Sequence, residues 1–176
     1  MFSRNPELYS CDRFQQAYLD RGWPTGDSIS VIKKIDRMVR SRFRYRRDRG
    51  DKWDAHPEVL LQSKSTLKGD CDDQAATTVA MALCAGVPRD KLGFVITSPD
   101  FDNISTTENH ILGFYRDDDG NFWRLGDTKY AVTPLNKGLG RISHWMYLDA
   151  PHHWVVNDPA NPVPIHLPTV AYEPQL

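Results

Sequence analysis

The chain has 176 residues, of which 40% are hydrophobic and 11% aromatic, enough for one domain with a packed core. Its 22 Lys and Arg residues nearly balance its 23 Asp and Glu residues, and the net charge of -1 argues against nucleic acid as a partner. The N-terminal residues show no basic segment followed by an apolar one, and nowhere do about 18 apolar residues run together. We therefore expect neither a signal peptide nor a membrane span, and a cytoplasmic or virion-associated protein.

In chain order, the first clear element is an amphipathic helix over residues 28–43, where apolar side chains recur at helical spacing. Asp27 or Ser28 can cap its start. The other face and the exit of this helix carry Lys33, Lys34, Arg37, Arg40, Arg42, Arg44, Arg46, Arg47 and Arg49. These residues form either a patch for nucleic acid or an acidic partner, or a solvated face, and the neutral balance of the chain favours the solvated face.

A second helix is predicted from Cys71, through the segment "CDDQAATTVAMALCAG", to a glycine and proline stop signal. Its small residues indicate close packing against neighbouring elements. If Asp70 or Gly69 is the N-cap, Cys71 lies in the first turn, where unpaired N–H groups and the helix dipole favour a thiolate. The alternative is that Cys71 is a small buried residue, as we expect for Cys84.

The three cysteines, Cys11, Cys71 and Cys84, are an odd number at wide spacing, and no Cys-x-x-Cys pair occurs. This pattern argues against a disulfide framework and against a cysteine zinc site. The sequence therefore predicts reduced thiols.

Residues 91–98, 110–117 and 121–128 are β-like runs, and "DDDG" between the last two is a turn signal. We predict an antiparallel sheet behind the second helix. Prolines are frequent toward the C-terminus, which predicts a single domain over residues 1–150 followed by an extended, proline-rich tail over 151–176. This tail could contact an assembly partner.

The predicted hairpin brings His110 near Asp127. With a turn at "DDDG", we expect the two residues directly opposite each other or one diagonal step apart, with their side chains on the same face. An acid in this place can fix the tautomer of the imidazole and support its charge. Cys71, His110 and Asp127 are therefore a candidate nucleophile, base and acid.

The segment "WDAHPEVLLQSKSTLKGDCDDQA" resembles the stretch before and through the catalytic cysteine of the bacterial transglutaminase-like cysteine proteinases. "RFRY", "GVPRDKL" and "NHILGFY" match in the family's order as well, so the resemblance covers about residues 28–130. It implies an α+β fold with a papain-like or transglutaminase-like core, in which a catalytic helix packs on an antiparallel sheet. It also implies Cys71 as nucleophile, His110 as base and Asp127 as orienting acid.

The chain departs from the family pattern at two points. Asp72 follows the cysteine where the family usually has Glu, and Asp127 is followed by Thr128 where the family often has an Asp-Asn pair. The charges that the chemistry needs are kept at both points.

The resemblance also implies calcium, because some members of the family bind it through the acids that flank the cysteine. Asp70, Asp72 and Asp73 offer the hard oxygen ligands that Ca²⁺ prefers, and the ion would offset their repulsion of a thiolate. Loop carbonyls and water would have to complete the usual about six to eight ligands. The alternative is that Asp70 and Asp72 cap the helix and interact with its dipole.

The leading hypothesis is a cysteine peptidase that cleaves a protein or peptide substrate through an acyl-enzyme intermediate. The N–H of Cys71 is a candidate oxyanion donor, and Trp53 is a candidate second donor. A transglutaminase, which transfers the acyl group to an amine, would use the same triad. A third hypothesis is a non-catalytic structural or virion assembly component that retains the fold, although a scaffold has no need of all three triad residue types.

Overall fold

The structure, a computed structural model, describes residues 11–47, 55, 57, 60, 65–98, 110–135, 141–149 and 155–156. The helices in these ranges are α1 (Gln15–Asp20), α2 (Ile29–Arg42), α4 (Cys71–Cys84) and the 3-10 turn η2 (Arg89–Lys91). The strands are β1 (Phe43–Tyr45), β2 (Leu67–Gly69), β3 (Leu92–Ser98), β4 (His110–Arg116), β5 (Phe122–Leu125), β6 (Arg141–Tyr147) and β7 (Val155–Val156).

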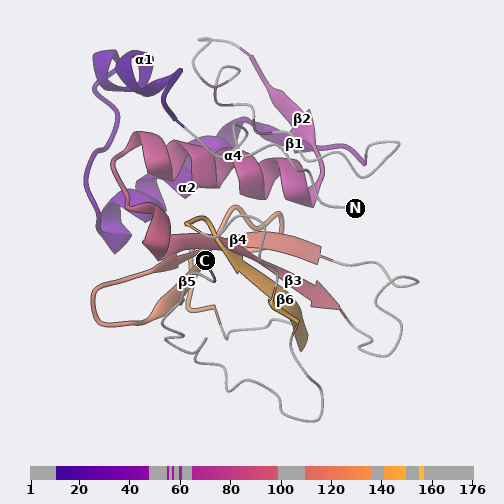
Figure 1. The fold of residues 1–176 in the computed structure, drawn as a ribbon. Coiled ribbons are helices and arrows are strands. Elements are labelled where there is room, and N and C mark those ends of the chain that lie inside the picture. The colour runs from indigo at the N-terminus through magenta and orange to yellow at the C-terminus, as the bar shows by residue number, and fades with distance from the viewer. Residues whose placement is uncertain are drawn as a thin grey trace.

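The strands form two sheets. The larger one has five antiparallel strands in the order β5-β4-β3-β6-β7, and β1 pairs with β2 in a small parallel sheet. Figure 1 shows α4 between the five-stranded sheet and the β1–β2 pair. This arrangement confirms the predicted α+β class, with a helix packed on an antiparallel sheet.

Helix α4 is buried along nearly its whole length and lies against strand β4. The small residues of α4 permit a close approach, and Gly113 on β4 permits it from the other side. A Cβ atom at Gly113 would lie 2.8 Å from Cγ2 of Val79, well inside normal contact. The sheet therefore holds the catalytic helix predicted from the sequence at short range, which fixes the position of its N-terminal end.

The amphipathic helix predicted at residues 28–43 is α2, and its apolar face joins the same core through Val31, Ile32, Ile35 and Val39. The hydroxyl oxygen of Ser28 accepts a hydrogen bond from the N–H of Val31 at 3.3 Å, so the predicted cap is confirmed.

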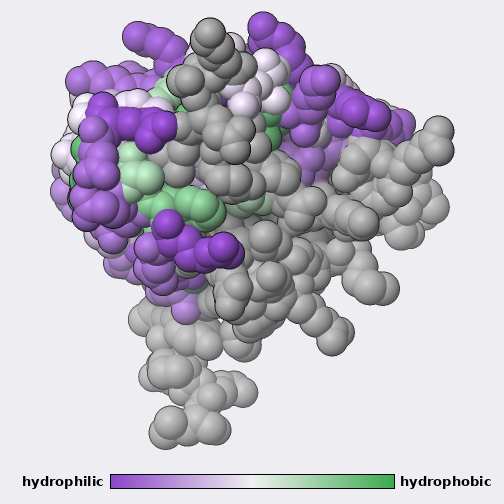
Figure 2. Space-filling view, turned by 90° about the horizontal axis from the view of Figure 1, so that it is seen from above, coloured by the Kyte–Doolittle hydropathy of each residue, from purple (hydrophilic) through white to green (hydrophobic). Residues whose placement is uncertain are grey.

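Two members of the basic run hold the fold together rather than facing a partner. Arg42 donates to the carbonyl of Ser65 at 2.7 Å and to the carbonyl of Leu60, and Arg40 reaches the chain after β5. Six others are exposed: Lys33, Lys34, Arg37, Arg44, Arg46 and Arg47. In a view from above Figure 1, most of the described residues at the surface are hydrophilic (Figure 2).

The expectation of reduced thiols is wrong for two of the three cysteines. Cys11 and Cys84 form a disulfide, with their Cα atoms 5.0 Å apart although they are separated by 73 positions in the chain. Wide spacing in sequence does not measure distance in the fold, which is why the pattern misled.

No helix in the described part of the chain is long and apolar enough to cross a membrane. Apart from Val155 and Val156, which pair with β6, the tail at residues 151–176 lies outside the described residues. The boundary between residues 150 and 151 stays a prediction.

Candidate active site

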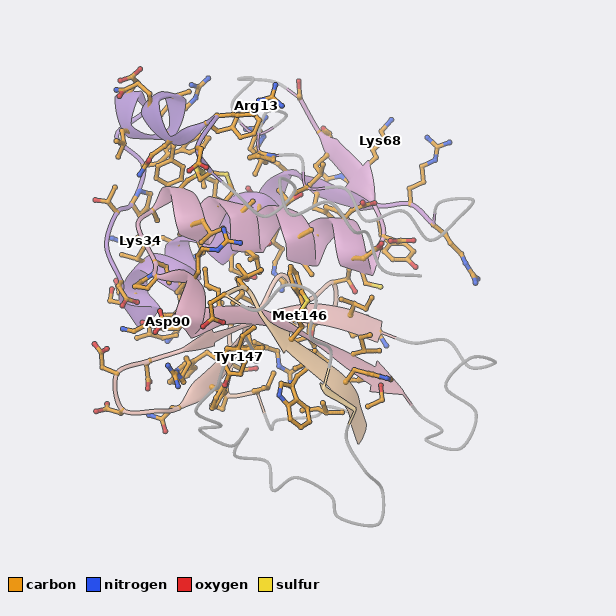
Figure 3. The ribbon with its side chains drawn as sticks, viewed as in Figure 1. Arg13, Lys34, Lys68, Asp90, Met146 and Tyr147 are labelled. Carbon is orange, nitrogen blue, oxygen red and sulfur yellow. A yellow bond between two sulfur atoms is a disulfide. The ribbon has the colours of Figure 1, made fainter. Side chains whose placement is uncertain are left out.

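Cys71 is the first residue of α4, with Asp70 at the N-cap. Asp70 and Asp73 form a capping box, in which the carboxylate of Asp73 accepts from the N–H of Asp70 at 3.2 Å. Strand β2 leads directly into this turn, and Lys68 on β2 points outward at the same end of α4 (Figure 3). The thiol of Cys71 is free and half-buried, at the end of the helix where backbone N–H groups favour an anion.

His110 begins strand β4, and its side chain is 24% exposed. Nε2 of its ring lies 3.1 Å from Oδ1 of Asp127, and the ring is near enough to Cys71 for the two groups to interact electrostatically. An ionised carboxylate only accepts, so Nε2 donates to it and Nδ1 is left for the thiol. Burial alone would lower the pKa of His110, but the bonds and charges of Asp127 and Cys71 raise it to about 9.

Asp127 reaches His110 by a route that differs from the predicted hairpin register. The N–H of Asp117 donates to the carbonyl of Asn121, which leaves a loop of the three residues between them. In the strands that follow from this turn, Gly113 pairs with Leu125. In this register the strands alone would not place residue 127 opposite residue 110. Strand β5 ends at Leu125 instead, and the turn that follows carries Asp127 to the histidine.

The turn depends on Gly126, whose φ of 64° is costly for other residues. A Cβ atom here would also lie 2.7 Å from Cα of Ala75 on α4. The N–H of Gly126 donates to Oδ1 of Asp36 on α2 at 2.8 Å. Burial raises the pKa of Asp36, and this bond and the neighbouring Arg40 oppose that rise.

The main chain of Asp127 is fixed from two helices. Arg40 on α2 donates to its carbonyl oxygen at 2.7 Å and to the carbonyl of Tyr130, and Gln74 on α4 donates to the same Asp127 oxygen at 3.2 Å. Sequence reasoning missed Asp36, Arg40 and Gln74 as positioning residues. A carboxylate within the apolar stripe of α2 was the available signal for Asp36.

The carboxylate of Asp127 is fixed by its own loop and by Arg124. Oδ1 also accepts from the N–H of Lys129 at 2.8 Å, and Oδ2 accepts from Nη1 of Arg124 at 3.0 Å. Burial would raise the pKa of Asp127, but these bonds and His110 hold it below its usual range. Asp127 is therefore an ionised, buried acid with a defined partner at each oxygen.

The three predicted metal ligands divide into two kinds. The ligand atoms of Asp70, Cys71 and Asp72 lie within 4.8 Å of one another, whereas Asp73 is engaged in the capping box. Two clustered carboxylates suit Ca²⁺, but a sulfur atom is too soft a ligand for it. The capping alternative named Asp70 and Asp72, but the capping box joins Asp70 to Asp73, and the calcium alternative retains Asp70 and Asp72. Trp53 lies outside the described residues.

The transglutaminase-like superfamily model matches residues 17–154, and the chain belongs to this superfamily. Its fold is similar to LapG of Legionella pneumophila, with a TM-score of 0.53 and 15% identity over 78% of this chain and 83% of that one. The calcium-bound form of LapG gives 0.54 and 16%, over 78% and 76% of the two chains. A candidate cysteine protease from Cytophaga hutchinsonii gives 0.50 and 12%, over 87% and 55%. A comparison with curated proteins gives no match.

Proposed function

We propose that this chain is a cysteine peptidase that hydrolyses a peptide bond in a protein substrate. The observation that carries the proposal is the arrangement of three side chains: a free thiol at a helix N-terminus, a histidine that interacts with it, and a buried acid hydrogen-bonded to the ring of that histidine. Cys71 is the nucleophile, His110 the general base and Asp127 the acid that orients the imidazole.

In the first half of the reaction, Nδ1 of His110 takes the proton of the Cys71 thiol, and the thiolate attacks the peptide carbonyl carbon. The backbone N–H of Cys71 can donate to the oxygen that becomes negative. When the C–N bond breaks, the imidazolium gives its proton to the leaving amine, and the acyl group remains on sulfur. In the second half, His110 takes a proton from water and the hydroxide attacks the carbonyl carbon of the thioester. The C–S bond then breaks, the carboxylic acid leaves, and the Cys71 sulfur regains the proton from His110.

Calcium belongs to the proposal as a bound ion rather than as a reactant. Asp70 and Asp72 would hold it, with main-chain carbonyls and water as further ligands. The calcium-bound LapG structure supports this idea through fold similarity. The ion would supply positive charge beside the thiolate, which the neighbouring carboxylates otherwise oppose.

Two other functions are tested by the same assay. Transfer of the acyl group to an amine differs only in the second nucleophile, and a non-catalytic assembly role would need no reactive thiol. The interaction of Cys71 with His110 favours a catalytic role over the assembly role.

The test is incubation of the purified protein with unfolded casein, in calcium and in chelator, with and without a labelled primary amine. New peptide N-termini, detected by mass spectrometry and absent with Cys71→Ala, are the expected result. Amine incorporation without cleavage would replace the peptidase by an acyl transferase. Neither product, together with a Cys71 thiol that alkylates no faster than free cysteine, would overturn both enzymatic functions.

A further inference from the structure

Arg124 on β5 is a buried cation directly behind the acid of the site. Its side chain and that of Asp127 are each 1% exposed, and Nη1 lies 3.0 Å from Oδ2. The ring of Tyr130 covers the guanidinium, with its centre 5.0 Å from Cζ. We propose that Arg124, held under Tyr130, is a positioning residue that fixes the Asp127 carboxylate so that Oδ1 faces His110. The inference rests on the proposed function for its kinetic part alone.

The two oxygens of the carboxylate have separate partners. Oδ1 accepts from His110 at 3.1 Å and Oδ2 accepts from Arg124 at 3.0 Å, so rotation of the carboxyl group would break both bonds. Arg40 also lies nearby, but it binds the main-chain carbonyl of Asp127 and makes no contact that fixes the carboxylate. Within the described residues, Arg124 and His110 are the positively charged side chains that contact the carboxylate, and Arg124 does so at the oxygen that His110 leaves.

Arg124 is itself held in place by the chain that follows the turn. Its N–H donates to the carbonyl of Thr133 at 2.9 Å, and the N–H of Leu135 donates to the carbonyl of Phe122 at 2.8 Å. Residues 126–135 therefore return along β5 and close over the guanidinium. The loop that carries Asp127 and the strand that carries Arg124 form one unit.

A purely structural arginine would be expected to use more of its donors. Among the described residues, Nε and Nη2 of Arg124 have no hydrogen-bond partner and are buried. Burying a guanidinium with unused donors costs free energy, and the Asp127 pair and the Tyr130 ring are the contacts that offset it. The side chain is thus committed to the acid of the triad.

The test compares Arg124→Met and Arg124→Lys with wild type, and uses Arg116→Met as a matched control. Arg116 on β4 also pairs with a carboxylate, that of Asp90 at 3.8 Å, and lies 6.0 Å from the centre of the Tyr147 ring. Loss of one arginine, one ion pair and one ring contact is therefore common to the two methionine variants. Circular dichroism reports whether each variant folds.

The first readout is the proton NMR signal of the His110 Nε2–H, assigned by its loss in Asp127→Asn, and it requires no substrate. We expect Arg124→Met to lose this signal, and Arg124→Lys and Arg116→Met to keep it. The second readout is peptide hydrolysis, where Arg124→Met should lower kcat about 10- to 100-fold at unchanged KM, because misplacing a catalytic group slows the chemical step. Arg124→Lys should recover most of kcat.

A folded Arg124→Met variant that keeps both the signal and kcat would overturn the inference. So would an equal loss in Arg116→Met, which would make the effect a general one of losing an arginine and its ion pair. If Arg124→Met does not fold, Tyr130→Ala decides: a weakened signal with kcat several-fold lower supports the inference, and wild-type values overturn it. A wild-type protein that shows the NMR signal but no hydrolysis would refute the proposed function while leaving the positioning role intact.

Discussion

Helix α4 has a cysteine at each end, and the two serve different purposes. Cys71, the first residue, is half-buried, outside any disulfide, and interacts with His110. Cys84, the last residue, is 1% exposed and bound covalently to Cys11. One 14-residue helix therefore carries a free cysteine at one end and a disulfide-bonded cysteine at the other.

The difference follows from the ends of the helix and from what lies against each. Unpaired N–H groups at the N-terminal end stabilise a thiolate, while carbonyl groups at the C-terminal end disfavour one. A histidine with a buried acid faces the first cysteine, and the segment before α1 faces the second. The residue type is the same, and its surroundings decide the chemistry.

The largest effect is expected when the two cysteines of α4 are replaced in separate variants, which tests their different roles. Cys71→Ala should reduce peptide hydrolysis on the order of 10⁶-fold, the cost of removing a nucleophile, because no acyl-enzyme can form. The control is the double variant Cys11→Ala with Cys84→Ala, which should still hydrolyse peptide. Steady-state hydrolysis measures both, and residual activity in Cys71→Ala near the wild-type value would refute the assignment.

The next largest effect is expected for the acid that orients the base. Asp127→Asn should lower kcat on the order of 10³- to 10⁴-fold, because an amide can hold His110 in the wrong tautomer. The fold should persist, since Arg40 and Gln74 bind the main-chain carbonyl of residue 127. Kinetics together with a thermal melt test this, and full activity in a folded Asp127→Asn would exclude Asp127 from the mechanism.

The sequence predicted the elements whose signal is local. Helix α2 has apolar spacing and a serine cap, α4 has a cap and a stop signal, and β3, β4 and β5 are regular apolar runs. It also brought together Cys71, His110 and Asp127, which are adjacent in the structure; their catalytic roles stay a prediction.

Features that depend on contacts between distant segments were missed or misjudged. Strand β6 is buried on both faces, with Ser143, Trp145 and Met146 inside, so it shows no alternation. The parallel pair β1 and β2 has three residues in each strand, too few for a pattern.

In the candidate active site too, the features that were missed depend on contacts between distant segments. The hairpin register was wrong because the loop has three residues, and the turn at Gly126 replaced the strand pairing that was expected to bring Asp127 to His110. The disulfide and the proposed role of Arg124 depend on which distant segments of the chain meet in three dimensions. The spacing of residues in the sequence does not reveal these contacts.

A third prediction concerns the structural cysteine. Replacing Cys11 and Cys84 by alanine should lower the free energy of unfolding by about 2–4 kcal/mol, because the disulfide closes a long loop in the unfolded chain. Urea unfolding of the double variant, compared with wild type in the presence and absence of reductant, measures it. Equal stability in all three samples, or free Cys84 by mass spectrometry under oxidising conditions, would contradict the disulfide.

A fourth prediction concerns the pH dependence of activity and stability that follows from the pKa of His110. With its pKa raised to about 9, His110 holds the proton taken from Cys71 as an imidazolium at neutral pH. Because the imidazolium must give this proton to the leaving amine, kcat/KM should fall about tenfold per pH unit above that value. Because the folded pKa exceeds the unfolded one of about 6.5, the stabilisation that His110 contributes is complete below pH 6.5 and is lost as pH rises through about 9. The pH–rate profile tests the first statement and pH-dependent melts the second.

The control for the pH prediction is Asp127→Asn. The hydrogen bond and charge of Asp127 raise the pKa of His110, so the alkaline limb of this variant should move to lower pH. A limb that stays near pH 9 in Asp127→Asn would assign it to a group other than His110.

The smallest expected effect is that of calcium at the N-terminal end of α4. If Asp70 and Asp72 bind the ion, a free concentration of about ten times Kd should stabilise the fold by about 1.4 kcal/mol, since the unfolded chain lacks the assembled site. Thermal melts in calcium and in EGTA measure this shift, which Asp72→Asn should abolish and Asp119→Asn, in the exposed turn after β4, should leave unchanged.

The ion should also act on one cysteine only. Because it would neutralise the acids beside Cys71, iodoacetamide should label that thiol faster in calcium than in EGTA at the same pH, while Cys84 stays unlabelled in both as long as its disulfide is intact. Equal labelling rates together with unchanged melts would mean that the aspartates serve as caps of α4. The helix N-terminus and His110 would then be left to stabilise the thiolate without an ion.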